Sequence, residues 1–215
     1  VLPSDVTLLR VRVVALDTDV ELRRAIDSTP VVTGTFVGSQ DNQVIIDYSV
    51  GDDGSVTLTL EEARSSAFPR LETVGRGTLQ IDLPPLVPMD VEFVNQNGDI
   101  TLNLSGTQLE RLNVNAPRGD VLVTLPEYEP RLSERGDLLG VIAAQNGSLT
   151  LRVPATVAAR LELTRSGSGI EPQYDPSVYN YLVGDVLESR AIETSATVLR
   201  YSLVAPRGLI RLDVP

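Results

Sequence analysis

The sequence predicts an all-β protein whose strands form a β-solenoid, a stack of coils of about 21 residues each. The first observation is that apolar residues recur at every second position in many segments, which is the period of a strand buried on one face. The second is that helical spacing is sustained nowhere in the 215 residues. The third is that glycines recur at a nearly constant interval. Gly77, Gly98 and Gly119, for example, follow one another at intervals of 21 residues.

Six segments carry three apolar residues at spacing two, and each is expected to be a strand of one coil. The positions between them are mostly polar, so one face of each strand is predicted to be buried and the other to face solvent. In chain order the apolar rows are Val56-Leu58-Leu60, Leu79-Ile81-Leu83, Ile100-Leu102-Leu104, Val121-Val123-Leu125, Leu149-Leu151-Val153 and Ile210-Leu212-Val214.

A glycine precedes each of these strands and is predicted to form the corner of its coil, because glycine adopts the positive φ of a tight turn without steric cost. Proline follows several of the strands, as at Pro84, Pro126 and Pro154, and it ends a strand because it has no N–H group for the ladder. The predicted structural corners are Gly54, Gly77, Gly98, Gly119, Gly147 and Gly208.

The coils are expected to depend on one another for stability. Burying three apolar side chains contributes roughly 5–9 kcal/mol, whereas ordering one coil costs on the order of 20–40 kcal/mol. A single coil therefore cannot fold alone, and its apolar row must be covered by the rows of its neighbours.

Three regions are expected along the chain. Residues 1–50 lack the glycine-led unit and form an N-terminal β cap or irregular first coils, and residues 51–170 hold the glycine-led coils. Residues 171–215 hold a loop and C-terminal strands that continue the same stack. Since the chain ends on a strand, this last strand is a candidate assembly edge. The residues of the candidate assembly edge are Leu209, Ile210, Arg211, Leu212, Asp213 and Val214.

An antiparallel β-sandwich is the alternative fold. Asn-Gly between two alternating apolar runs, as at Asn97-Gly98, is the strongest short-range signal for a hairpin, and several hairpins would form a sandwich. The solenoid is favoured because a sandwich does not require a fixed period.

The composition excludes several kinds of chemistry. The chain has 18 basic residues, all of them arginine, and 29 acidic residues, and its net charge of −11 argues against nucleic acid as a partner. It has no Cys, His, Trp or Lys, so it can hold no Cys or His zinc site, no Ser-His-Asp triad and no Schiff-base lysine. We therefore predict that the protein is not an enzyme and has no catalytic residues, no cofactor and no metal site.

Several short motifs are interpreted as local structure. Arg118-Gly119-Asp120 and Arg135-Gly136-Asp137 spell the tripeptide of integrin ligands, but glycine corners recur throughout the chain, so both are interpreted as corners. Asp52-Asp53-Gly54 lacks the later acidic residues of a calcium loop and is interpreted as a solvated turn. Gly167-Ser168-Gly169 lacks the third glycine and the strand-to-helix setting of a phosphate-binding loop, so it predicts no nucleotide site.

The segments 97–104, 118–126 and 146–154 each hold a glycine corner followed by alternating apolar residues. They resemble the repeats of the bacterial adhesin-like β-strand repeat families of unknown function, to which the toast-rack domains are related. The resemblance covers roughly residues 50–170. It implies a right-handed, β-helix-like stack in an exported or envelope-associated bacterial protein, and it brings no catalytic residues to this chain.

These observations predict a non-enzymatic structural or adhesin-like module, extracellular or in the cell envelope. Its expected partner is itself, through the solenoid ends in a filament or surface array, or another envelope protein. An envelope stress-sensor or regulatory binding domain is the alternative, and a carboxylate-based glycan-active enzyme is the third. Because the chain begins at Val1, we expect that a leader has been removed, and no apolar run is long enough to cross a membrane.

Overall fold

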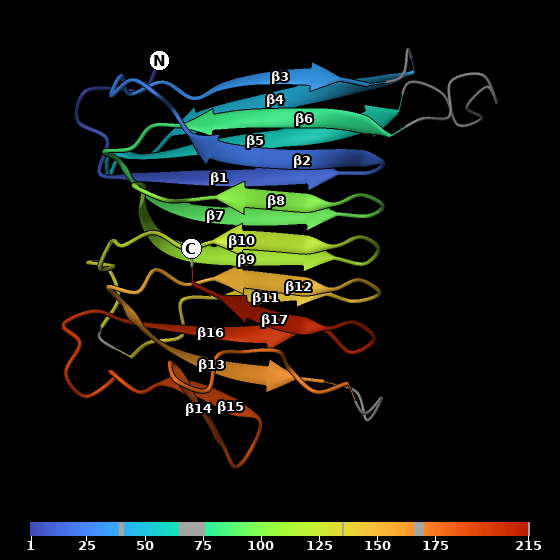
Figure 1. Ribbon diagram of the computed structural model, residues 1–215. Coiled ribbons are helices and arrows are strands. Elements are labelled where there is room, and N and C mark those ends of the chain that lie inside the picture. Colours follow the sequence, from blue (N-terminus) through green and yellow to red (C-terminus); the bar gives the residue numbers. More distant parts are fainter. Residues whose placement is uncertain (39–40, 65–75, 135, 166–169, 215) are drawn as a thin grey trace.

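The computed structural model describes residues 1–38, 41–64, 76–134, 136–165 and 170–214 (Figure 1). These residues form seventeen strands and no helix, so the predicted all-β class is confirmed. The strands belong to two mixed sheets, one of ten strands and one of seven, and neither sheet closes on itself.

The ten-stranded sheet is called sheet A here. Its strands, in spatial order, are β14 (Tyr179–Leu182), β15 (Val186–Ser189), β13 (Ala158–Thr164), β16 (Val198–Val204), β11 (Val141–Ala144), β9 (Gln108–Ala116), β7 (Pro88–Asn95), β1 (Leu8–Ala15), β5 (Ser55–Arg64) and β4 (Asn42–Val50). The seven-stranded sheet is called sheet B. Its strands, in spatial order, are β17 (Ile210–Asp213), β12 (Leu149–Arg152), β10 (Val121–Thr124), β8 (Ile100–Asn103), β2 (Thr18–Arg24), β6 (Gly77–Leu83) and β3 (Thr33–Val37).

Successive strands in the middle of the chain alternate between the two sheets. The chain runs from β7 in sheet A to β8 in sheet B, then to β9 and β10, and later from β11 to β12. We call one strand of sheet A and the strand of sheet B that follows it a passage of the chain. Each strand pairs in parallel with its counterpart in the next passage, and Ile100 of β8, Val121 of β10 and Leu149 of β12 lie directly beside one another. The apolar rows expected from the sequence are therefore stacked in register in sheet B.

Antiparallel pairing is found at both ends of sheet A and at one end of sheet B. At one end β3 pairs with β6 and β4 pairs with β5. At the other end β15 pairs with both β13 and β14. Sheet A thus has a parallel middle part between two antiparallel ends, whereas sheet B ends on the parallel strand β17 at its other edge (Figure 1).

The spatial order of the strands departs from chain order at two places. The first passage of the chain, β1 and β2, lies between β5 and β6 on one side and β7 and β8 on the other. The last passage is also interior in sheet A, because β16 lies between β11 and β13. The C-terminal end of the chain accordingly lies partway along the stack (Figure 1).

The inward faces of the two sheets form one apolar cluster. Ile100, Leu102 and Leu104 are completely buried, as are most of their counterparts in the neighbouring strands. The largest buried side chains include Phe93 and Tyr201, both on sheet A. Alternation of apolar and polar residues therefore decides which face of each strand enters the core.

The glycine corners have a different physical basis from the one expected. Only Gly54 and Gly119 have a positive φ among the six predicted corners. The expectation of positive φ is therefore wrong for the other four, which are Gly77, Gly98, Gly147 and Gly208.

Close stacking of backbone explains why a side chain is excluded at these corners. A Cβ on Gly147 would lie 1.9 Å from the carbonyl oxygen of Gly119, and a Cβ on Gly119 would lie 2.0 Å from that of Gly98. A Cβ on Gly208 would likewise lie 1.9 Å from the carbonyl oxygen of Gly147. Each glycine thus lets the next passage of the chain approach closely, which is the second reason that folds use this residue.

Candidate functional site

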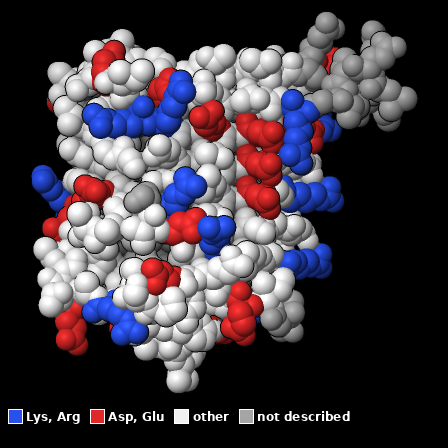
Figure 2. All heavy atoms as spheres, viewed as in Figure 1, with Lys and Arg blue, Asp and Glu red and all other residues white. Residues whose placement is uncertain are grey.

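Polar side chains form a ladder beside the stacked glycines. Asp19 Oδ1 accepts the Asp99 N–H at 2.9 Å, and Asp99 Oδ1 accepts the Asp120 N–H at 2.8 Å. Asp120 Oδ1 in turn accepts the Ser148 N–H at 2.8 Å. Figure 2 shows acidic side chains gathered in a column near the right of the view, with basic side chains beside them. Each carboxylate in the ladder therefore satisfies a backbone donor of the neighbouring passage.

A second ladder runs through the residues that precede the glycines. An Arg118 Nη1 donates to Asn97 Oδ1 at 3.1 Å, and Asn97 Nδ2 donates to Asp17 Oδ1 at 3.0 Å. Arg207 Nη1 donates to Asn146 Oδ1 at 2.7 Å. These bonds join adjacent passages at the corners, so the two ladders are structural in kind.

The two integrin-like tripeptides fall in different places. Arg118-Gly119-Asp120 lies at the corner between β9 and β10, and both of its charged side chains belong to the ladders. A receptor that bound these side chains would have to break those bonds. Of the second tripeptide, Arg135 lies outside the described residues. Asp137 accepts the Glu134 N–H at 3.0 Å, within the loop that precedes β11.

The remaining short motifs show no ligand-binding arrangement. Asp53 Oδ1 accepts both the N–H and the hydroxyl of Ser55, at 2.9 and 2.6 Å, and these bonds hold the pKa of Asp53 below its usual value. Asp52-Asp53-Gly54 is thus a local turn. The described residues contain no cluster of three or more acidic side chains placed to hold a metal ion. The segment 167–169, with its Gly-Ser-Gly sequence, lies outside the described residues.

Sequence reasoning missed a buried carboxylate, Glu110. It is 1% exposed, and its two oxygens accept bonds from the Tyr128 hydroxyl at 2.9 Å and from the N–H groups of Arg131 and Leu132 at 2.8 and 2.9 Å. Burial, with the bond to Glu110 as the second cause, raises the pKa of Tyr128 to about 12. Glu110 therefore anchors the loop between β10 and β11.

A signal for Glu110 was present in the sequence. Leu109 pairs with Met89 and Arg111 pairs with Asp90, so Glu110 is the extra residue of a β-bulge. The apolar spacing is consequently three residues, from Leu109 to Leu112, instead of two.

A second buried carboxylate, Glu62, closes the corner between β1 and β2. It is 2% exposed, and Glu62 Oε2 accepts the N–H groups of Leu16 and Asp17 at 2.6 and 3.2 Å. Asn42 Nδ2 donates to Glu62 Oε1 at 2.6 Å. Glu62 occupies the inward position that follows Leu60 in β5, which is how its burial could have been expected.

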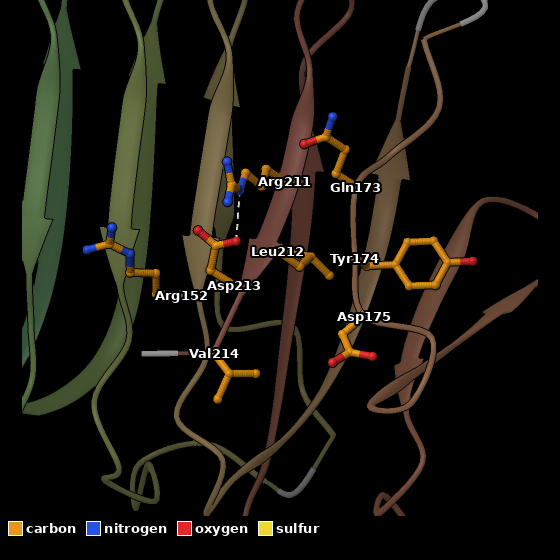
Figure 3. Close-up of a pocket in the computed structure, with 8 residues that line it drawn as sticks. All are labelled: Arg152, Gln173, Tyr174, Asp175, Arg211, Leu212, Asp213 and Val214. Atoms are coloured by element: carbon orange, nitrogen blue, oxygen red, sulfur yellow. Dashed lines mark hydrogen bonds and ion pairs between the residues drawn. The ribbon is translucent and has the colours of Figure 1, made fainter.

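The outer face of sheet B carries an open groove, which we call the sheet B groove. One part, of about 410 Å³, lies over β8, β10, β12 and β17, and a larger part, of about 940 Å³, lies beside β17. The two parts share Arg152, Arg211 and Asp213. The wall beyond β17 is the segment of Gln173, Tyr174 and Asp175 (Figure 3).

Gln173 fixes this wall to the last strand. The Gln173 N–H donates to the Ile210 carbonyl at 2.9 Å, and the Leu212 N–H donates to the Gln173 carbonyl at 2.8 Å. The candidate assembly edge, Leu209 to Val214, therefore pairs with β12 on one side and makes one parallel bridge to Gln173 on the other.

The charges in the groove are balanced and mostly paired. Arg211 Nε lies 2.8 Å from Asp213 Oδ1, on neighbouring side chains of β17 (Figure 3). Asp175 Oδ1 accepts the N–H and hydroxyl of Ser177, both at 2.7 Å, and these bonds lower the pKa of Asp175. Arg152 makes no ion pair with any described residue. The groove thus presents charged and amide groups that include both hydrogen-bond donors and hydrogen-bond acceptors.

Tyr174 belongs to a second cluster behind this wall. Its ring stacks on Tyr181 with centroids 6.2 Å apart, and the guanidinium of Arg165 lies 5.7 Å from the centre of the Tyr181 ring. Arg165 Nη2 also donates to Asp185 Oδ1 at 2.6 Å. In Figure 3 the ring of Tyr174 points away from β17, so it supports the wall more than it lines the groove.

Within the parts of the chain that the structure describes, no helix has the length and apolar character needed to cross a bilayer.

Comparison with known proteins relates the chain to others by fold. No protein-family model matches it, and no curated protein matches its sequence. The crystal structure of a "putative cell adhesion protein" from Clostridium sporogenes ATCC 15579 superposes with a TM-score of 0.83 at 16% identity, over 100% of this chain and 96% of that one. The alignment with a "putative adhesin" from Bacteroides fragilis NCTC 9343 covers 97% of this chain and 94% of that one at 13% identity, with a TM-score of 0.28. The first likeness shows a shared fold across the whole chain.

Proposed function

We propose that the protein is a non-enzymatic, adhesin-like module that binds a neutral glycan in the sheet B groove. The observation that carries this proposal is the balanced set of planar hydrogen-bonding groups there: two arginines, two aspartates and a glutamine on one open surface. Support also comes from the shared fold with a protein described as a "putative cell adhesion protein".

The chemistry of the groove suits hydroxyl groups. A guanidinium donates to hydroxyl oxygens, a carboxylate accepts from hydroxyl protons, and an amide does both. A neutral ligand is favoured over an acidic one because the net charge of −11 repels anions at long range. The strands β12 and β17 hold Arg152, Arg211 and Asp213 on a rigid surface, which lowers the entropy lost on binding.

A hydrolytic role for the same groove is disfavoured by its electrostatics. A glycan hydrolase needs a carboxyl group that stays protonated, so the pKa of its general acid is raised. The pKa of Asp175 is instead lowered, and Asp213 is paired with Arg211. Binding without cleavage is therefore the function that this charge arrangement supports.

We also propose that the two sheets are the sides of a β-solenoid. Parallel pairing in register between successive passages, and the stacked glycines at the corners, support a coil-by-coil stack over a sandwich of antiparallel hairpins. A module of this kind would act outside the cell or in the envelope, where an extended, rigid surface is exposed to glycans.

Binding to an array of neutral oligosaccharides, followed by calorimetry with the strongest binder, tests the groove. Since Arg152 has no ion-pair partner among the described residues, Arg152→Ala should leave the fold intact and weaken binding about 10–100-fold, the effect of losing a charged hydrogen bond. Arg12→Ala is the matched control, because Arg12 is an exposed arginine on β1 of sheet A. Equal affinity in both variants, or no binding to any neutral glycan, would reject the groove as the site.

A further inference from the structure

The end of the stack that holds β3 and β4 exposes apolar side chains on two edge strands. β4 is the last strand of sheet A and β3 is the last strand of sheet B, and they lie together at the end shown uppermost in Figure 1. The nine residues of β4 include no proline and no basic residue.

The exposed side chains of β4 include residues that point toward the core. Ile46, Tyr48 and Val50 pair with Leu60, Leu58 and Val56 of β5, and paired residues in a sheet point to the same side. Their β5 partners are buried, yet Ile46, Tyr48 and Val50 are 64%, 50% and 53% exposed. This apolar row has the position of a core row, but no further row among the described residues covers it.

The backbone of β4 is also free to pair on its outer side. The Gly51 N–H donates to the Ser55 carbonyl, so Gly51 faces β5. N–H and C=O groups alternate in direction along a strand, and therefore those of Val44, Ile46, Tyr48 and Val50 point away from β5. Natural edge strands are usually protected by proline, lysine, a bulge or a short length. β4 has a continuous register with β5 and only Asp47 as a charged residue.

The opposite end of sheet A is closed differently. Tyr179 of β14 and Leu187 of β15 are 2% and 0% exposed. The last strand of sheet B at that end, β17, bridges to Gln173. The described residues there present no matching apolar row, which argues against head-to-tail growth of a filament through the β4 end.

We propose that the β4 end binds the same end of a second copy of this chain, giving a two-fold dimer in which the two β4 strands pair antiparallel. A two-fold axis perpendicular to a strand reverses its direction, so antiparallel pairing of identical edges follows from symmetry. A second copy supplies both things that this end lacks, which are a pairing partner for the strand edge and an apolar row that covers its own. This inference does not depend on the glycan site.

The size of the surface agrees with a dimer interface. A nine-residue strand is about 30 Å long, and two sheets about 10 Å apart with their outer side chains are about 20 Å across. The end face is thus on the order of 600 Å², close to the roughly 800 Å² that each partner buries in a standard interface.

Light scattering and sedimentation equilibrium across a dilution series test this proposal. We expect the wild-type chain to be a dimer that dissociates on dilution. Ile46→Lys should raise the dissociation constant by about 30-fold or more, as loss of a central interface residue does. Ile45→Lys is the matched control, because Ile45 lies next to Ile46 on β4 but points to the outer face. It should dimerise like the wild type.

Hydrogen exchange of the wild-type protein gives a second readout that involves no variant. At high concentration the N–H groups of Val44, Ile46, Tyr48 and Val50 should exchange slowly, and they should lose this protection on dilution. A chain that is monomeric at all concentrations, an oligomer that Ile46→Lys leaves unchanged, or protection of the Leu209–Val214 edge instead would each overturn the proposal.

Discussion

Single residues join each passage of the chain to the next. At three of the corners the absence of a side chain is what matters, because the carbonyl oxygen of the preceding corner glycine occupies the place that a Cβ on Gly119, Gly147 or Gly208 would take. Beside these glycines an aspartate, arginine or asparagine side chain bonds to the neighbouring passage. Glycine sets how closely two passages approach, and the polar neighbour satisfies the backbone groups that this approach brings together.

Gly147→Ala tests whether close approach, and not φ, is the reason for glycine at the corners. Gly147 has no positive φ, but its new Cβ would lie 1.9 Å from the Gly119 carbonyl oxygen. We expect a loss of about 3 kcal/mol in the free energy of unfolding, measured by urea denaturation, since backbone must move to relieve the contact.

The control for this substitution is Gly184→Ala. Gly184 has a φ of 88°, but no atom lies within 4 Å of the place that its Cβ would take. Only the left-handed backbone is therefore penalised, by about 1–2 kcal/mol. If Gly147→Ala proved no more damaging than Gly184→Ala, stacking would not be the constraint at the corners.

At the scale of the strand, the pairing order gives the last passage an interior position. β16 pairs with β11 on one side and β13 on the other, and the second partner of β13 is β15. Among the described strands, β13, β14 and β15 therefore reach the rest of sheet A through β16 alone. Removing the last passage should consequently affect strands that precede it in the sequence.

Deletion of residues 196–215 is expected to do more than remove one end. In a stack built in chain order, loss of the last coil costs one interface and leaves the remainder folded. Here β13, β14 and β15 should lose their protection in hydrogen exchange, while β7 to β10 keep theirs, because the ladder between β13 and β16 is gone.

Deletion of residues 210–215 is the control for this experiment. It removes β17 from the edge of sheet B but keeps β16, so β13, β14 and β15 should stay protected. Protection of β13, β14 and β15 in the longer deletion would contradict the pairing of β13 with β16.

The sequence predicts those features of the structure that local contacts determine, and it does not predict those that depend on contacts between distant residues. Alternation is a local signal, and the rows that begin at Val56, Leu79, Ile100, Val121 and Leu149 all begin in observed strands. The order of the strands is not local. Every row has the same apolar pattern, so the pattern allows any row to stack on any other, and the positions of β1 and β16 could not be predicted from it.

Charged residues mark the second limit of sequence reasoning. Glutamate is a residue type that is almost always exposed, yet Glu62 and Glu110 are both buried, with their oxygens bonded to backbone and side-chain donors. The sheet B groove was also beyond prediction, because Gln173 and the strand that it bridges, β17, are far apart in the sequence. In all three places a long-range hydrogen bond, and not local hydrophobicity, decides the structure.

At the scale of the whole molecule, the two ends of the stack differ from each other, whereas its middle is regular. Sheet B repeats the same parallel contacts from β8 to β17, whereas the antiparallel strands at the β4 end and at the β14 end cover the core unequally. Each passage contacts mainly the passages on either side of it, so stability should behave as a sum of terms between neighbours.

A core substitution in the middle of the stack tests this view of the whole chain. Phe93 is 1% exposed in β7, near the centre of sheet A, and Phe93→Ala should lower the free energy of unfolding by about 3–5 kcal/mol through the cavity it leaves. If stability is a sum over neighbouring passages, weakening a central passage also uncouples the two halves. The urea transition should then broaden, with a smaller m value, because the halves expose their surface in separate steps.

Phe36→Ala, near the β4 end, is the control that separates position from residue type. Phe36 is only partly buried, so its loss should cost only about 1 kcal/mol, and the m value should stay unchanged because the end passage can fray without dividing the stack. A Phe93→Ala transition that shifts to lower urea with an unchanged m value would instead mean that the two sheets unfold as one cooperative unit, as expected of a sandwich.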